Sequence, residues 1–119
     1  MNTYIGVHLE VEGIHRWKGV METPYKDEMS YLVDFHRHNF IIDCEMKVHH
    51  DDRDKEFISL KHDIMSYLRQ EFWSTQHQLC WFGDMSCEMI ARLLLEKFGL
   101  TKCKVSEDGE NYAIIINND

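Results

Sequence analysis

The sequence is poor in the features that mark several protein classes. It has a single proline and six glycines among 119 residues, so it lacks the composition of collagen-like and disordered chains. Its longest apolar runs, such as Ala113–Ile116, fall far short of the ~20 residues that a membrane-spanning helix needs. Since 44% of the residues are hydrophobic, we expect one folded domain over residues 1–119, with no membrane partner.

Secretion and disulfide signals are also missing. Residues 1–12 carry no basic cluster followed by an apolar stretch and small cleavage residues, so we expect a cytoplasmic protein. The four cysteines form no C-x-x-C pair. In a reducing compartment they should remain thiols.

Acidic residues outnumber basic residues in the sequence. Lys and Arg total 13 against 21 Asp and Glu, which gives a net charge of -8, and the basic residues are scattered along the chain. This disfavours nucleic acid as a partner, because a phosphate backbone is bound by clustered positive charge. Histidine, by contrast, is abundant, with eight residues. Imidazole serves both metal binding and proton transfer, so the placement of these histidines bears on function.

Two stretches in the first half alternate apolar and polar residues, which is the pattern of half-buried β-strands. The first covers residues 4–12 and ends near Gly13, and the second runs from Phe35 to Val48. Between them, Arg16–Ser30 loses the alternation and is predicted to be a polar connection, long enough to be functional.

Two helices are predicted in the second half. Apolar residues recur at helical spacing over Glu56–Phe72. A second helix is capped by Asp84 or Ser86 and closes at Gly99. The segment between the helices, residues 73–83, shows no regular pattern.

Two more strands follow the second helix. Alternation returns over Lys102–Glu107, and after the turn residues Asp108 and Gly109 a fourth strand covers Tyr112–Ile116. The order β-β-α-α-β-β predicts an α+β fold, with an antiparallel four-stranded sheet and both helices packed on one face.

His36 and His38 stand two residues apart on a predicted strand. Both imidazoles therefore emerge from one face, with their α-carbons about 6.6 to 6.8 Å apart, a spacing that suits two ligands of one metal ion. His15, just past the first strand, could supply a third nitrogen if the first two strands pair as a hairpin. Three histidines with one open position are the pattern of a catalytic zinc site, where the ion polarises a carbonyl or acidifies a bound water. The alternative is an exposed histidine pair at a strand end.

Two further residues could carry chemistry. Because side chains alternate along a strand, Glu107 faces the same apolar side as Cys103 and Val105. An unpaired carboxylate is costly on that side, so we expect Glu107 to have a partner there. That partner is either an arginine or a ligand whose hydrogen bonds the carboxylate accepts, unless the side chain turns outward at the strand end. His77 lies in the irregular segment, from where a general acid or base could reach a cleft, or it is a solvated loop residue.

Five segments together resemble one known family. Gly13-Ile14-His15-Arg16 looks like its first zinc-histidine motif, and His36-Arg37-His38-Asn39-Phe40 looks like its H-G-H-[NS]-[YF] motif with Arg37 in place of glycine. Residues 56–61 (EFISLK) are similar to its D-F-x-x-L-K helix start, residues 86–88 (SCE) stand in place of its P-T-x-E helix opening, and residues 107–113 (EDGENYA) match its E-x-x-x-N-x-A pattern. The family is that of 6-pyruvoyltetrahydropterin synthase and 6-carboxytetrahydropterin synthase, whose subunits have the T-fold order β-β-α-α-β-β.

The resemblance implies a Zn²⁺ ion held by His15, His36 and His38, and a pterin ring clamped by Glu107. It implies a small-molecule partner of pterin or purine-like chemistry. It also implies a homo-oligomer with ligand sites at subunit interfaces, because T-fold subunits associate into barrels.

The chain departs from the family in its proton carriers. The family's catalytic cysteine stands four residues before the first histidine of H-x-H, and this position is Leu32. Its Asp-His pair appears here as Gln76-His77, so His77 would shuttle protons without an orienting carboxylate. Glu28 or Asp34 could supply a replacement base, and the sequence does not choose between them.

Three functions are consistent with these residues. The first is a zinc-dependent lyase acting on a substrate like dihydroneopterin triphosphate. The second keeps the zinc and a pterin-like or purine-like pocket but performs different chemistry. The third is a non-catalytic ligand-binding or assembly module in which zinc is structural.

Overall fold

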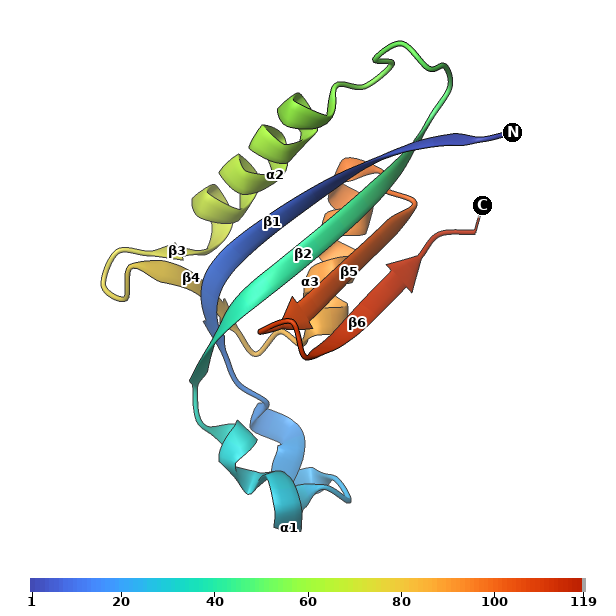
Figure 1. Cartoon of the computed structure of the whole chain (residues 1–119). Coiled ribbons are helices and arrows are strands. Elements are labelled where there is room, and N and C mark those ends of the chain that lie inside the picture. Colours follow the sequence, from blue (N-terminus) through green and yellow to red (C-terminus); the bar gives the residue numbers. More distant parts are fainter. Residues whose placement is uncertain (119) are drawn as a thin grey trace.

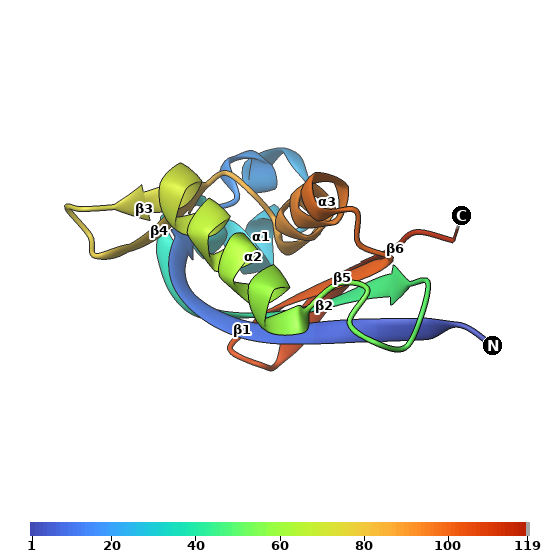
Figure 2. The same ribbon diagram turned by 90° about the horizontal axis from the view of Figure 1, so that it is seen from above.

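The computed structural model describes residues 1–118 and has α+β architecture, as predicted. Two long helices pack on one face of a curved sheet (Figures 1 and 2). The elements, in chain order, are β1 (Thr3–His15), η1 (Lys18–Glu22), α1 (Lys26–Met29), η2 (Ser30–Val33), β2 (His36–Val48), α2 (Phe57–Phe72), β3 (Trp73–Ser74), β4 (Leu79–Gly83), α3 (Cys87–Phe98), β5 (Lys102–Glu107) and β6 (Asn111–Ile116).

The sheet has six strands in the order β3-β4-β1-β2-β5-β6, so the prediction of a four-stranded antiparallel sheet is correct only for its central part. The four predicted strands are antiparallel neighbours, whereas β4 pairs with the end of β1 in parallel. Both additional strands lie in the segment predicted to be irregular. The β4 run Leu79–Phe82 is apolar throughout and therefore lacks the alternation by which the other strands are identified.

The alternation along β1 and β2 produces the core. The odd-numbered residues of β1 from Val7 to Val11 and the residues of β2 that face them, Phe40, Ile42 and Cys44, are buried beneath the helices, and Phe40 and Ile42 are inaccessible to solvent. Helix α2 adds Leu60, Ile64 and Leu68 to this core.

Both long helices begin and end near the predicted residues. The carboxylate of Glu56 accepts a hydrogen bond from the Ser59 amide at the start of α2. Ser86, one of the two caps considered, accepts from the Met89 amide at the start of α3. Gly99 closes α3 with φ of 63°, a left-handed conformation that glycine adopts without strain. No helix among the described residues is long and apolar enough to cross a membrane.

The predicted polar connection between β1 and β2 is a small helical lobe. It contains η1, α1 and η2 and projects beyond one end of the sheet (Figure 1). Val20 is fully buried inside it, and the Trp17 amide donates to the Leu32 carbonyl at its base, 2.7 Å away. The lobe returns the chain so that β2 starts beside the end of β1.

Candidate metal centre

The pairing of β1 with β2 brings the three predicted histidines together. His15 lies directly opposite His36, and His38 lies opposite Gly13, all on the face that the helices cover. The centroids of the imidazole rings are 4.6 Å apart for His15 and His36, 5.4 Å for His15 and His38, and 5.0 Å for His36 and His38. The hairpin pairing on which the third nitrogen depended is therefore present.

Gly13 leaves room for the rings of Phe40 and Phe82, which together form an aromatic floor beneath this cluster. A β-carbon at this position would lie 2.6 Å from the Phe82 ring and 2.9 Å from the Phe40 ring. The Phe40 ring in turn makes edge contacts with the rings of His15 and His38, at centroid distances of 5.1 and 5.7 Å. Because Gly13 has no side chain, the Phe40 ring can occupy the position in which it contacts His15 and His38.

Each of the three imidazoles has a partner at Nδ1. The contacts are His15 Nδ1 with the Met85 carbonyl at 2.8 Å, His36 Nδ1 with the Asp34 carbonyl at 2.9 Å, and His38 Nδ1 with the Asp108 carboxylate at 2.7 Å. Because all three partners are acceptors, they assign the proton to Nδ1 and leave a lone pair on Nε2. Metal-ligating histidines have this arrangement, in which the second nitrogen donates to a carbonyl or carboxylate.

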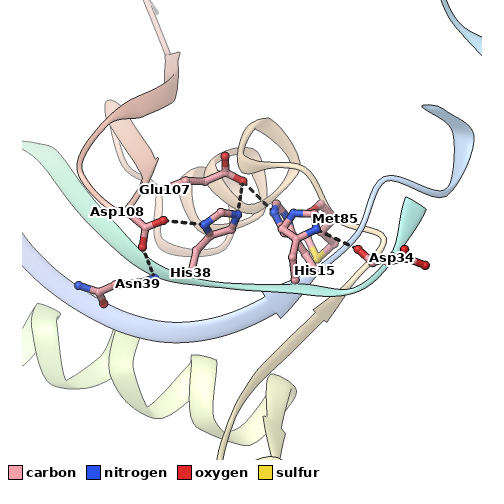
Figure 3. A network of polar contacts seen from close by, with 8 residues as sticks. His15, Asp34, His38, Asn39, Met85, Glu107 and Asp108 are labelled. Carbon is pink, nitrogen blue, oxygen red and sulfur yellow. Dashed lines mark hydrogen bonds and ion pairs between the residues drawn. The ribbon is translucent and has the colours of Figure 1, made fainter. Parts of the chain in front are cut away.

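Glu107 completes the cluster from the end of β5, and Figure 3 shows its carboxylate beside His15 and His38. On the neighbouring strand, Glu107 pairs with Phe40. Its Oε2 lies 2.8 Å from His15 Nε2 and 3.4 Å from His38 Nε2. Glu107 therefore has the partner that we expected on the apolar side, but the partner is a pair of histidines and not an arginine.

His15 Nε2 is buried and has no hydrogen-bond partner among the described residues, although the Glu107 oxygen is close. The ring proton is on Nδ1, so in neutral His15 the Nε2 lone pair faces a carboxylate lone pair. Either a proton on Nε2 or a cation shared by both atoms makes this contact favourable.

The donor set fits a divalent metal ion. One ligand atom from each of His15, His36, His38 and Glu107 lies within 4.8 Å of the others. Three imidazole nitrogens and a carboxylate oxygen are a donor set that Zn²⁺ accepts, and the orphaned Nε2 of His15 is the atom that such an ion would satisfy.

The electrostatics of the cluster follow from its burial and its carboxylate. Burial would lower the pKa of His15, but Glu107 and the Met85 carbonyl favour the charged ring and leave the pKa raised. Burial dominates at His36, whose pKa is lowered. The contact with His15 holds the pKa of Glu107 below its usual range despite partial burial, so the carboxylate is ionised at neutral pH.

A cavity of about 150 Å³ opens beside the cluster. It lies between the end of β1, the start of β2, the lobe and the start of α3, and its lining consists of His15, Arg16, Trp17, Leu32, His36, Met85, Ser86 and Glu107. Leu32, at the position of the family's thiol, is therefore beside the candidate metal centre and contributes an apolar wall.

None of the three predicted proton carriers is among the side chains that form the cluster. Glu28 is exposed on α1. Asp34 is adjacent to His36, but the atom that contacts the ring is its backbone carbonyl and not its carboxylate. His77 packs on Trp81, with ring centroids 4.9 Å apart. Trp81 pairs with Ile14, whose side chain points to the opposite face from that of His15, so His77 lies on the far face of the sheet.

The structure also places Arg37, which stands where the family motif has glycine, and Cys44, the cysteine nearest in sequence to the two histidines of β2. Arg37 points away from the two histidines that flank it and forms an ion pair with Glu12 on the opposite face. Cys44 is buried against Cys103, with the sulfur atoms 3.8 Å apart, and takes no part in the cluster.

Structural comparison shows which fold this is. A 6-pyruvoyl tetrahydropterin synthase from Caenorhabditis elegans superposes with a TM-score of 0.70 and 14% identity, covering 99% of this chain and 97% of that chain. The chain has the T-fold of this synthase. An uncharacterized protein from Wolinella succinogenes gives a TM-score of 0.67 at 12% identity, covering 99% of each chain.

A third similar structure is a catalytic-residue mutant of the 6-pyruvoyltetrahydropterin synthase from Plasmodium vivax, in which alanine replaces a glutamate. Its TM-score is 0.63 at 12% identity, and the match covers 100% of this chain and 99% of that chain. No family model and no curated protein matches the sequence. The likeness to the synthases is therefore one of fold, and the fold that the sequence motifs predicted is confirmed.

Asp108 is a residue of the centre that sequence reasoning missed. It was identified only as part of a turn, and its φ of 58° agrees with that role. Its carboxylate also accepts hydrogen bonds from the Asn39 amide, at 2.8 Å, and from His38. These contacts keep the pKa of Asp108 below its usual range, the amide being the larger influence. The match of residues 107–113 to a family pattern marked the segment but not this residue's role.

Proposed function

We propose that this protein is a zinc-dependent lyase of the tetrahydropterin-synthase type. His15, His36 and His38 would hold the ion, and the substrate would resemble dihydroneopterin triphosphate. The observation that carries the proposal is the convergence of three Nε2 lone pairs, each oriented by a partner at Nδ1, beside an ionised carboxylate.

The ion would act as a Lewis acid that lowers the pKa of substrate hydroxyls and stabilises an enolate. Glu107 would bind the heterocycle, because an ionised carboxylate accepts hydrogen bonds from ring N–H and amino donors. Asp108 would keep the His38 ring in the ligating tautomer.

Proton transfer is the step for which this chain offers the fewest groups. His77 faces away from its own chain's centre, so it would serve the centre of a neighbouring copy in a homo-oligomer with shared sites. Glu28 and Asp34 remain candidates for the base, and both would need to approach the cavity from the lobe.

The apolar wall of the cavity favours a second candidate function. Leu32 and Trp17 line the space beside the cluster and offer no side-chain acid or base there. The same centre would then bind a pterin-like or purine-like molecule and perform chemistry that needs no thiol, or serve as a non-catalytic ligand-binding module.

A turnover assay separates these functions. Zinc-loaded protein is incubated with dihydroneopterin triphosphate, and products are identified by mass spectrometry, with His38→Ala as the metal-site variant. His62→Ala is the matched control, since His62 is an exposed histidine on α2. Zinc-dependent product from the wild type and the control, but not from His38→Ala, would support the lyase.

No product from any form would reject the lyase. A thermal-shift screen of pterins and purine nucleotides then tests the second function. Stabilisation by a ligand that Glu107→Ala abolishes would support that function, whereas equal responses in the two proteins would show that the pocket is wrongly assigned.

A further inference from the structure

The Glu107 carboxylate is held inside the histidine cluster. Its Oε2 contacts the Nε2 atoms of two rings, His15 at 2.8 Å and His38 at 3.4 Å. The His15 side chain is only 8% exposed, whereas that of Glu107 is 30% exposed. Glu107 thus reaches the buried nitrogen from the open side of the cluster, which is the side that a substrate must use.

A proton on His15 Nε2 would account only for the contact between His15 and Glu107. The Nδ1 atoms of His36 and His38 are also occupied by acceptors, so their Nε2 lone pairs converge on the same space. Protonating all three rings would gather three positive charges against one carboxylate. A single divalent cation accepts all three lone pairs and the carboxylate oxygen together.

A centre with four protein ligands is closed. Zinc sites with four protein donors are structural, whereas catalytic sites keep a position for water or substrate. With Glu107 as the fourth donor, the open position that the proposed reaction needs would be filled by the chain itself.

Glu107 has a second space available on its other side. A cavity of about 190 Å³ lies between the start of α3 and the start of β6, and Glu107 lines both this cavity and the one beside the cluster. The first amides of a helix have no partner within it, and the Ser86 hydroxyl takes only the Met89 amide. Cys87 and Glu88, the first two residues of α3, line the second cavity, so this cavity borders the helix end at which a carboxylate is favoured.

We infer that Glu107 is a displaceable fourth ligand. In the ligand-free protein it closes the coordination of the ion bound by His15, His36 and His38, and it leaves that position when a substrate enters. The inference rests on the proposed function and adds a regulatory step to the same site. Glu107 would then cap the ion at rest and bind the heterocycle in the complex.

The test measures metal binding and coordination, not turnover. Cobalt(II) replaces zinc, because its visible spectrum reports coordination number and ligand geometry. Affinity is measured by competition with a chromophoric chelator for the wild type, Glu107→Gln and the control Glu110→Gln. Glu110 is an exposed glutamate in the turn between β5 and β6.

Glu107→Gln should lower the cobalt affinity about tenfold or more, because even the loss of an outer-shell partner has that effect. It should also change the visible spectrum, while Glu110→Gln matches the wild type. Adding dihydroneopterin triphosphate to the cobalt-loaded wild type should then shift its spectrum. Should Glu107→Gln fail to fold by circular dichroism, Glu107→Asp, which keeps the charge but shortens the reach, replaces it in the comparison.

Three results would overturn the inference in different ways. If the wild type binds cobalt and the Glu107 variant has the same affinity and spectrum, Glu107 is no ligand, and the proposed function is unaffected. If the wild type binds neither cobalt nor zinc, the proposed function fails and this inference fails with it. A spectrum that the triphosphate leaves unchanged although the compound binds would exclude displacement.

Discussion

Replacing Gly13 with alanine tests the packing beneath the histidines. The new β-carbon would lie 2.6 Å from one Phe82 ring atom and 2.9 Å from a Phe40 ring atom. Carbon atoms pack at about 3.5–4.0 Å, so the Phe82 ring must move by about 1 Å. Both rings are buried, with exposures of 2% for Phe82 and 0% for Phe40, and the core offers them little space.

Overpacking of this kind costs about 1–3 kcal/mol, which in a domain of this size lowers Tm by several degrees. The displaced Phe40 ring also supports His15 and His38, so zinc affinity should fall together with stability. Thermal melting of the zinc-free protein and chelator competition measure the two effects separately.

Gly6→Ala is the matched control, because Gly6 is on the same strand and its added β-carbon would lie 3.4 Å from the nearest atom, the Cys44 carbonyl oxygen. Neither glycine has a positive φ, so the comparison isolates the steric effect. Gly6→Ala should be neutral or stabilising by a few tenths of a kcal/mol. Equal stability of the two variants, with zinc affinity unchanged in Gly13→Ala, would refute the argument that the floor positions the histidines.

Three further predictions follow from the contacts. Asn tolerates the left-handed conformation of residue 108, but Asp108→Asn leaves one oxygen for two donors, the His38 ring and the Asn39 amide. Zinc affinity, measured by chelator competition, should therefore fall about 10- to 100-fold. An unchanged affinity would exclude an orienting role for Asp108. The four cysteines are buried, and burial raises the pKa of Cys87 to about 12, so a chromogenic thiol reagent at neutral pH should react with none in the native protein and with four after unfolding. The hydrogen bond from His8 to Asp43 raises the pKa of His8, so the stabilising contribution of this hydrogen bond is complete below about pH 6.5 and is lost as pH rises through the raised pKa. In Asp43→Asn, the midpoint of the His8 titration measured by NMR should therefore fall. An unchanged midpoint would contradict the pairing of His8 with Asp43.

The long elements were predictable because their patterns are local. Alternation identified β1 and β2, and helical spacing together with the Ser86 cap and Gly99 identified α3. Strand β4 was missed because its pairing with β1 depends on tertiary contact, and a short apolar run without alternation does not distinguish strand from helix. The lobe was missed for a similar reason, since its helices have only four or five residues each.

The sequence predicted those parts of the candidate site that are formed by side chains. Spacing and motif likeness brought out His15, His36, His38 and Glu107, and the structure brings these four together. The Met85 and Asp34 carbonyls that orient two of the rings are backbone groups, which no residue type reveals. The position of His77 on the far face also required the sheet, because it follows from the pairing of β4 with β1.

The most direct test of the account is the metal content of the protein, measured by elemental analysis after purification without chelator. The account predicts one divalent ion per chain in the wild type and in His62→Ala, and its loss in His15→Ala and His38→Ala. Wild-type protein that is folded by circular dichroism, carries no ion and takes up none from added zinc would contradict it.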